Sequence, residues 1–559
     1  MRMHLRRQSM VAMGLAGVLV LAACGGDDGG SDSGGGEGGG GGEGGGSLVF
    51  GASSDPVTLD AAYVSDGESL RVIRQIFEGL VTTEEGGTEV VPALAKEWEN
   101  SEDGLQWTFT LEEDVTFHDG EPFDAEAVCA NFDRWFNFTG LQQSSSVSYY
   151  YQTVFGGYAN NESEDLAEPL YDSCEASDET TAVITLTSPS ASFLTGLTLP
   201  SFSIASPKAL EEGNADQVGG TDEEPQFEGT FGTENPIGTG PFRFDSWEVG
   251  NRLVLSRNED YWGEKAKLER LIFRPIADGP ARTQALQSGE IQAFDGVDPA
   301  DVERLRSEYE ILERPAFNVG YLGFNVDAPP LDNLKIRQAI AHAINREALL
   351  QANYPEGSEV ATQFMPPELF GYADDVPTYE YDLEKAKSLI AESGVANPTI
   401  EFWYPTDVTR PYMPDPAANF QAMQSDLQAA GFTVNPKSAP WRPDYLAAAQ
   451  SGAAQVHLLG WNGDFADPDN FVGTFFRTKQ PAWGSLDPSI YTDLDAARVE
   501  SDLDARAELY QAANKKIMEF LPGVPYVHNK SFLVTAKGVE GLTPSPVSNE
   551  VFAPVSVSE

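Results

Sequence analysis

Basic residues are scarce in this chain of 559 residues. It contains 35 Lys and Arg against 87 Asp and Glu, which gives a formal net charge of −52 at pH 7. Proteins that hold nucleic acid or anionic lipid need clustered cations for the phosphates, and no basic stripe occurs along this sequence. The composition therefore excludes a nucleic-acid partner, and the acid excess bears on solubility rather than on fold.

Long apolar runs are also absent. The basic start MRMHLRRQSM is followed by VAMGLAGVLVLAA, which is shorter than the roughly 20 residues that a spanning helix needs. Because LAAC ends this run, residues 1–23 resemble a bacterial lipoprotein signal peptide, with cleavage before Cys24 and a lipid on its sulfur. We expect the mature protein on the outer face of the cytoplasmic membrane, held by its acyl chains. The alternative is a plain secretory signal with an accidental cysteine.

The segment after Cys24 has no apolar side chain. It reads GGDDGGSDSGGGEGGGGGEGGG, contains only Gly, Asp, Ser and Glu, and cannot bury a core. As a random coil it would span roughly 25 Å. Residues 24–46 are therefore predicted to be a flexible tether. The alternative is that the Gly run is a simple spacer whose length has no particular function.

Motifs of the common hydrolases and phosphate-binding proteins are missing. The chain has no Gly-x-Ser-x-Gly elbow and no His-Glu-x-x-His pair, and GTGPF around Gly240 lacks the Lys of a phosphate loop. The four histidines of the mature chain are scattered along the sequence: His118, His342, His457 and His528. We therefore expect no enzyme activity, no catalytic residues, no metal and no cofactor, and we keep a secreted hydrolase as a distant alternative.

Cysteine is nearly absent, with three in the whole chain. Cys24 belongs to the lipoprotein pattern, which leaves Cys129 and Cys174. In an oxidising compartment these two are predicted to form a disulfide, and two free buried thiols are the alternative.

The body of about 510 residues alternates helical and strand patterns. Residues 69–81 place apolar side chains at helical spacing, and Asp124 is positioned to cap the helix that follows it. Farther along, the short apolar runs TIEFWYP and VHLLGW are separated by the helical ANFQAMQSDLQAAG. This order predicts α/β lobes, and the length suffices for two or three of them.

Five blocks of the body resemble the extracytoplasmic solute-binding proteins of family 5, the peptide-binding components of ABC importers. The blocks follow in order at ordinary spacing and cover nearly all of the mature chain. They are LVTTEEGGTEVVPALAKEWENSEDGLQWTFTLEEDVTFHDGEPFDAEAVCANFDRW, NPIGTGPFRFDSWEVGNRLVLSRNEDYWG, RTQALQSGEIQAFDGV, LGFNVDAPPLDNLKIRQAIAHAINREAL and GWNGDFADPDNF.

The resemblance implies an α/β bilobal fold of the periplasmic-binding-protein type II, with an extra N-terminal subdomain and mixed sheets in two hinged lobes. Two segments would cross between the lobes, near Pro315–Tyr321 and Leu521–Asn529. The implied division is 47–315 for lobe one with its inserted subdomain, 316–525 for lobe two, and 526–559 for the return to lobe one.

The resemblance also suggests ligand-binding residues. In GWNGDFADPDNF, Asp464 matches the position that pairs with a dipeptide's α-ammonium, and Arg410 in TRPYMP matches the position that holds its α-carboxylate. An acid and a base at neighbouring strand ends would select a short zwitterion. The alternatives are that Asp464 caps a turn or binds a cation with Asp467 and Asp469, and that Arg410 is a surface arginine.

Two tryptophans, Trp461 and Trp403, would pack on ligand side chains or fill a core. The expected partners are a short peptide and the permease of an ABC transporter, with the protein acting as a monomer. Within the same family a sugar, nickel complex, opine or haem ligand remains an alternative, as does a lipoprotein receptor that signals without import. The acidic run at 211–235 has no assigned function.

Overall fold

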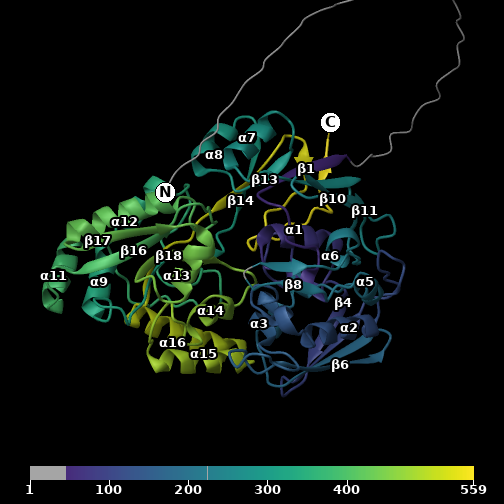
Figure 1. Ribbon diagram of the computed structural model, residues 1–559, viewed down its shortest axis with the longest axis horizontal. Coiled ribbons are helices and arrows are strands. Elements are labelled where there is room, and N and C mark those ends of the chain that lie inside the picture. The colour runs from purple at the N-terminus through teal and green to yellow at the C-terminus, as the bar shows by residue number, and fades with distance from the viewer. Residues whose placement is uncertain (1–45, 223, 559) are drawn as a thin grey trace, which may run out of the picture. The chain divides into compact units, whose positions relative to one another are not determined.

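The computed structural model describes residues 46–222 and 224–558. The predicted signal peptide, Cys24 and nearly all of the tether lie outside these residues. Within the described ranges, no helix is both long and apolar enough to cross a membrane. Three large sheets organise the chain from residue 46 onward (Figure 1).

A mixed sheet of seven strands forms the centre of the first lobe. Strand β1 runs parallel to β12 and β13, whereas the other pairs are antiparallel. The helices α7 (Gly279–Gln287) and α8 (Pro299–Leu305) lie next to β13 and β14 (Figure 1). In spatial order the strands are β10 (Phe242–Glu248), β11 (Arg252–Arg257), β12 (Arg270–Pro275), β1 (Ser47–Ala52), β13 (Ala293–Asp295), β20 (Ser531–Thr535) and β14 (Glu310–Arg314).

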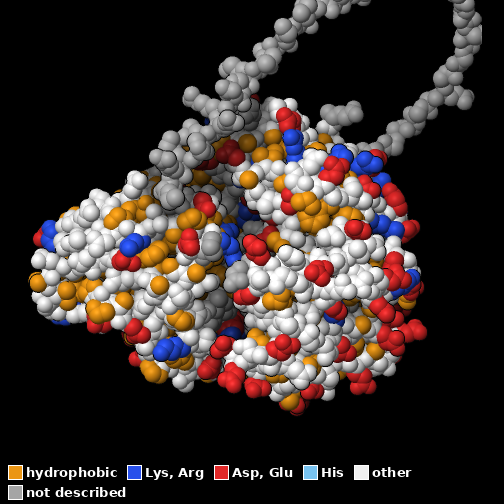
Figure 2. Space-filling model, viewed as in Figure 1, with side chains coloured by type: hydrophobic (Ala, Val, Ile, Leu, Met, Phe, Trp, Pro, Cys, Tyr) orange, Lys and Arg blue, Asp and Glu red, His pale blue; other side chains and the backbone are white. Residues whose placement is uncertain are grey.

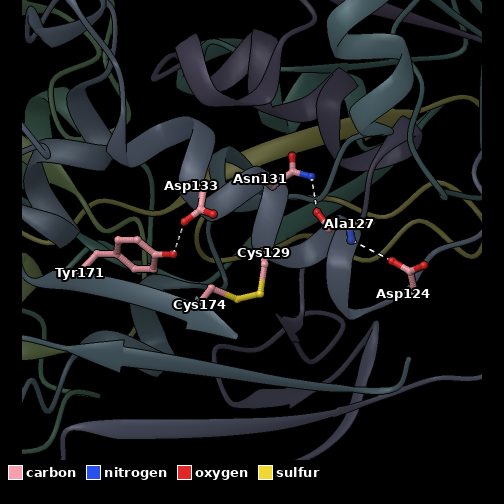
Figure 3. The surroundings of a disulfide bond; sticks show 7 residues. All are labelled: Asp124, Ala127, Cys129, Asn131, Asp133, Tyr171 and Cys174. Carbon is pink, nitrogen blue, oxygen red and sulfur yellow. Dashed lines mark hydrogen bonds between the residues drawn. A yellow bond between two sulfur atoms is a disulfide. The ribbon is translucent and has the colours of Figure 1, made fainter. Parts of the chain in front are cut away.

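A four-stranded antiparallel sheet belongs to a subdomain inserted between β1 and β10. Helix α2 (Ala125–Phe136) packs on β6, and the core between them is rich in aromatic side chains. The helix starts where the sequence predicts, because the Asp124 carboxylate accepts a hydrogen bond from the Ala127 amide at 2.8 Å (Figure 3). The strands are β4 (Ala95–Asn100), β5 (Gln106–Leu111), β7 (Thr181–Leu186) and β6 (Tyr171–Asp178).

A disulfide joins this helix to its sheet. Cys129 on α2 and Cys174 on β6 are bonded, with Cα atoms 5.2 Å apart (Figure 3). The Tyr171 hydroxyl of the same strand donates to the Asp133 carboxylate of the same helix at 2.7 Å. The insertion is thus linked both covalently and by hydrogen bonding at the α2–β6 contact.

The second lobe is built on a mixed sheet of five strands. Its interior strand β15 (Asn318–Phe324), which lies between β18 and β19, is buried along its whole length, as expected for a strand covered on both faces. Helices α9 (Leu334–Ala343), α11 (Leu383–Ser393) and α12 (Pro416–Ala430) lie together beside this sheet (Figure 1). The remaining strands are β17 (Thr433–Ala439), β16 (Thr399–Pro405), β18 (Val456–Asn462) and β19 (Gly523–Val527).

The chain passes twice between the seven-stranded and the five-stranded sheets. Residues 315–317, here called the first crossing, join β14 to β15, and residues 528–530, the second crossing, join β19 to β20. Both crossings are shorter than the segments predicted for them, because Asn318–Phe324 and Gly523–Val527 pair as strands of the second lobe.

One helix is shorter than the apolar pattern of residues 69–81 predicts. Helix α1 spans Gly67–Ile76, and Val81 begins a strand, β2 (Val81–Thr83), that pairs with β3 (Val90–Pro92). Apolar spacing continues past Ile76 because Phe77, Leu80 and Val81 are also buried. Phe77 belongs to the same core as Ile76, whereas Leu80 and Val81 belong to the aromatic core of the inserted subdomain. Periodicity alone does not separate these two states over a few residues.

Candidate functional site

Asp464 lies just beyond the end of a buried strand of the second lobe. β18 ends at Asn462, and its register pairs Asn462 with Asn318, the first residue of β15 after the first crossing. Ligand groups in α/β sheets commonly lie at strand ends of this kind. The fold therefore places Asp464 beyond the strand ends of the second sheet, on the side where the chain crosses between lobes.

Both carboxylate oxygens of Asp464 accept hydrogen bonds. The Tyr150 hydroxyl of helix α3 (Tyr149–Phe155), in the first lobe, donates to Oδ1 at 2.7 Å. The Asn470 amide donates to Oδ2 at 3.1 Å, and Asn470 Oδ1 accepts from the Asp464 backbone N–H at 2.9 Å. The carboxylate is therefore held by neutral donors from both lobes.

No cation neutralises Asp464 within the described ranges. Burial raises the pKa of this carboxyl to about 6, although the hydrogen bonds from Tyr150 and Asn470 lower it in part. A charged group in such surroundings is costly unless it is paired. The site thus offers a partly buried negative charge to a cation, and no described residue supplies one.

The other two aspartates of the loop have arginine partners. Asp467 accepts a bidentate pair of hydrogen bonds from Arg506 at 2.6 and 2.8 Å, and Asp469 forms an ion pair with Arg477. In the described part of the chain, no group of three or more His, Cys, Asp or Glu is placed to hold a metal ion. This arrangement argues against a cation site shared by the three aspartates.

Trp461 belongs to the same cluster as Asp464. Its indole N–H donates to Asn470 Oδ1 at 3.3 Å, and its ring meets Phe475 edge to face at 6.0 Å between centroids. Trp461 is partly exposed. The indole therefore helps to orient Asn470, which in turn holds the Asp464 carboxylate.

Arg410 lies in a loop that follows β16. Its backbone pairs with Met413 in both directions, at 3.1 and 2.9 Å. Its guanidinium carbon lies 4.5 Å from the centroid of the Trp441 ring, a cation–π contact. Among the described residues no carboxylate pairs with this guanidinium, and its buried Nε has no hydrogen-bond partner. Arg410 is thus fixed by stacking, and its charge has no anionic partner in the part of the chain that the structure describes.

The Arg410 loop is tied to the crossings. Asn529 of the second crossing donates to the Pro411 carbonyl at 2.5 Å. The same Asn529 exchanges two hydrogen bonds with Asn318, at 2.8 and 2.9 Å. Asn318 pairs with Asn462, which lies two residues before Asp464. The Arg410 loop and the Asp464 loop therefore approach the same end of the strands.

Trp403 has different neighbours. Its indole N–H donates to Glu401 Oε1 at 2.7 Å, and Lys437 Nζ lies 6.0 Å from its ring. These partners belong to β16 and β17, at the far side of the sheet from β15. The structure brings Asp464 and Trp461 together and gives Trp403 contacts of its own.

The four histidines of the described body do not converge. His118, His342 and His528 each contact a backbone carbonyl, and His457 is fully buried among aromatic rings. Burial lowers the pKa of His118, His457 and His528 to about 4. Each is therefore neutral at pH 7.

Sequence reasoning missed three residues of this site: Tyr150, Asn470 and Trp441. Tyr150 is more than 300 positions from Asp464 in the sequence, so no local pattern connects them. Asn470 belongs to the motif GWNGDFADPDNF itself, six residues after Asp464. Phe465 of this loop also packs into the aromatic core of the inserted subdomain.

Three comparisons with known proteins agree on the family. A model of bacterial extracellular solute-binding proteins, family 5, middle region, matches residues 89–483. The dipeptide-binding protein of Escherichia coli K12 is 34% identical over 498 residues, which cover 86% of this chain and 89% of that protein. Heme-binding protein A of Haemophilus influenzae is 29% identical, over 91% and 92%.

Among solved structures, this chain is similar to a periplasmic binding protein associated with an ABC transporter from Helicobacter pylori. That protein was solved in complex with the peptide STSA. The TM-score is 0.75 at 28% sequence identity, and the match covers 92% of this chain and 98% of the other. The bilobal α/β fold expected from the sequence is thus confirmed.

Proposed function

Because this chain belongs to the bacterial extracellular solute-binding proteins of family 5, we propose that it captures short peptides between its two lobes and delivers them to an ABC transporter permease. Relatives that are named for dipeptide binding, and a neighbour solved with a bound peptide, support this ligand class. The site then has to recognise a zwitterion.

One observation carries the proposal: two opposite charges, which have no ionic partner among the described residues, lie on loops at the same end of the strands of the second sheet. Asp464 would hold the peptide's α-ammonium, and Arg410 would hold its α-carboxylate through two parallel N–H bonds. Such charges cost free energy while unpaired, so a ligand that satisfies both recovers that cost on binding. Trp461 orients the acidic end through Asn470.

Closure of the lobes would complete the site. Tyr150 of the first lobe contacts Asp464, and Phe465 of the second lobe packs into the core of the inserted subdomain. A ligand that binds the closed form better than the open form shifts the equilibrium toward closure. The permease would then recognise the closed form of the protein.

The anchoring proposal follows from the sequence. A lipid on Cys24 and a Gly-rich tether at 24–46 would hold the body at the outer face of the cytoplasmic membrane, where a permease is within reach. We propose that a monomer performs this delivery.

A thermal-shift screen tests the ligand class. The purified protein is refolded to remove carried-over ligand and is then exposed to di-, tri- and pentapeptides, oligosaccharides, opines, a nickel complex and haem. Stabilisation by short peptides alone supports the proposal. Stabilisation by another class of compound, with no thermal shift from the peptides, would leave the fold assignment intact and contradict the proposed peptide ligand.

A further inference from the structure

Three parallel strands of the second lobe end on the same side of their sheet. β16 runs parallel to both β17 and β18 (Figure 1). Arg410 follows β16, Asp464 follows β18, and the turn η4 (Trp441–Tyr445) follows β17. Because the carboxyl ends of parallel strands meet at one end of a sheet, the turn after β17 belongs to the same region as the two charges of the peptide site.

The Arg410 side chain is oriented by stacking alone. Its backbone is held by two hydrogen bonds with Met413, but its guanidinium forms no ion pair or hydrogen bond with any described residue. Its position therefore depends on the face of Trp441, whose ring centroid lies 4.5 Å from the guanidinium carbon. A guanidinium stacked in this way keeps its N–H donors available to a carboxylate in its own plane.

Trp441 is itself held at its backbone and at its ring. Its backbone N–H donates to Asp407 Oδ1 at 2.7 Å. Its ring stacks on Tyr445, with 5.8 Å between the centroids and 22° between the planes. Trp441 is partly exposed, whereas Tyr445 is fully buried. The buried tyrosine therefore fixes the orientation of the indole on which Arg410 rests.

The Tyr445 hydroxyl connects this stack to the strand that leads to Asp464. It donates to the carbonyl oxygen of Leu458 in β18 at 2.5 Å. β18 pairs with β15 on one side and with β16 on the other, so it is held firmly within the sheet. Asp464 follows the same strand, and Asn470 holds its carboxylate. The carboxylate and the stacked guanidinium are thus both tied to β18.

A fixed separation of two opposite charges selects ligands by length. Each added residue lengthens an extended peptide by about 3.3–3.6 Å. A charge-assisted hydrogen bond has a length of about 2.7–2.9 Å and tolerates much smaller changes than that. A peptide of another length would therefore lose one of its two ion pairs unless Arg410 left the face of Trp441.

We propose that Trp441 and Tyr445 are positioning residues, which hold Arg410 at one distance from Asp464 and thereby set the length of peptide that this protein binds. The inference rests on the proposed function, because it concerns the same site. Neither ring needs to touch the ligand, since both act through Arg410.

Calorimetric titration of the purified protein with the di-, tri- and tetrapeptides of alanine tests the role in length selection. Wild type should bind one of the three at least about tenfold more tightly than the others, because only that peptide makes both ion pairs. Trp441→Leu should lower the affinity for the preferred peptide about tenfold and bring the three affinities within about threefold of one another. Tyr445→Phe keeps the ring and loses the hydroxyl, so it should also reduce the preference.

A peptide amide separates positioning from a general structural effect. The amide of the dipeptide lacks the carboxylate, so Trp441→Leu should bind it as wild type does. Trp441→Phe retains an aromatic face and should restore most of the length preference. Trp98→Leu is the matched control, because it changes a partly exposed tryptophan of β4 in the inserted subdomain and should behave as wild type.

The outcomes distinguish this inference from the proposed function. If wild type binds none of the peptides, the proposed function fails and the positioning role fails with it. The positioning role alone is wrong if wild type binds the peptides without a preference for length, or if Trp441→Leu keeps the wild-type preference. It is also wrong if Trp441→Leu loses affinity equally for the free dipeptide and its amide.

Discussion

The Tyr150 hydroxyl donates a hydrogen bond to Asp464 Oδ1 at 2.7 Å, and the two residues come from different lobes. This bond stabilises the ionised form of Asp464 and so opposes the effect of burial on its pKa. Tyr150 therefore controls how readily the carboxylate is available to a ligand cation.

Tyr150→Phe should move the titration of Asp464 to higher pH. Loss of the donor removes one of the interactions that lower the carboxyl's pKa, so the value rises above about 6. Peptide affinity measured against pH should then show its midpoint at higher pH than in wild type. Tyr149→Phe is the matched control, because no hydrogen bond joins Tyr149 to Asp464. Equal midpoints for both variants would show that the hydroxyl has no such role.

The affinity for peptides should fall in acid. Asp464 is protonated in the free protein below a pKa of about 6, and a neutral carboxyl does not pair with an ammonium. The dissociation constant is expected to rise roughly tenfold for each pH unit below 6 and to be flat from about pH 6.5 to 7.5. Calorimetric titrations from pH 4.5 to 7.5 measure this. A flat profile down to pH 4.5 would contradict the assignment of Asp464.

Asp464→Asn should weaken the binding of peptides with a free amino terminus by about 30- to 1000-fold, since truncating one partner of a buried charge pair costs roughly 2–4 kcal/mol. N-acetylated peptides lack the ammonium, so they should bind poorly to wild type and lose little more in the variant. Side-by-side titrations of free and acetylated dipeptides provide the comparison. If the free and the acetylated dipeptide lost affinity equally, the Asp464 carboxylate would not bind the peptide's amino terminus.

Much of the fold could be predicted because local signals agree with the global pattern. Asp124 caps α2 as predicted, and the segment ANFQAMQSDLQAAG, predicted to be helical, lies in α12. The runs TIEFWYP and VHLLGW form adjacent strands of one sheet. The predicted end of α1 was wrong, because buried side chains after Ile76 continue the apolar spacing through the connection to β2 and into that strand.

The site was only partly predictable, and the reason is distance along the chain. Asp464 and Trp461 belong to one loop, so a local motif indicates both. Tyr150 contacts that loop from the inserted subdomain, and Trp441 reaches Arg410 from a segment that follows β17. The first contact depends on how the lobes meet, and the second depends on the parallel pairing of β16 with β17. Hydrophobic periodicity encodes neither.

Reduction of the Cys129–Cys174 bond should destabilise the inserted subdomain. The bond closes a loop of 45 residues, and the chain-entropy model gives a loss of up to about 4 kcal/mol. The variant with both cysteines changed to Ala should unfold at lower urea concentration than wild type. Wild type in reducing buffer should approach the variant, and the variant itself should not respond to reductant. Equal midpoints in urea for oxidised wild type and the variant would rule out a stabilising role.

His457 should make the fold sensitive to acid. Its ring is fully buried beside Tyr321 and Trp483, and burial lowers its pKa to about 4. The unfolded chain takes up a proton near pH 6.5 and the folded protein does not, so the free energy of unfolding falls as pH drops from 6.5 toward 4. Between pH 7 and 5 this single histidine accounts for about 2 kcal/mol. Urea unfolding of His457→Leu at both pH values should show a difference smaller by that amount. A variant at the exposed surface, Glu99→Gln, should retain the full wild-type difference, and a wild-type-sized difference in His457→Leu would show that this ring does not remain neutral in the folded protein.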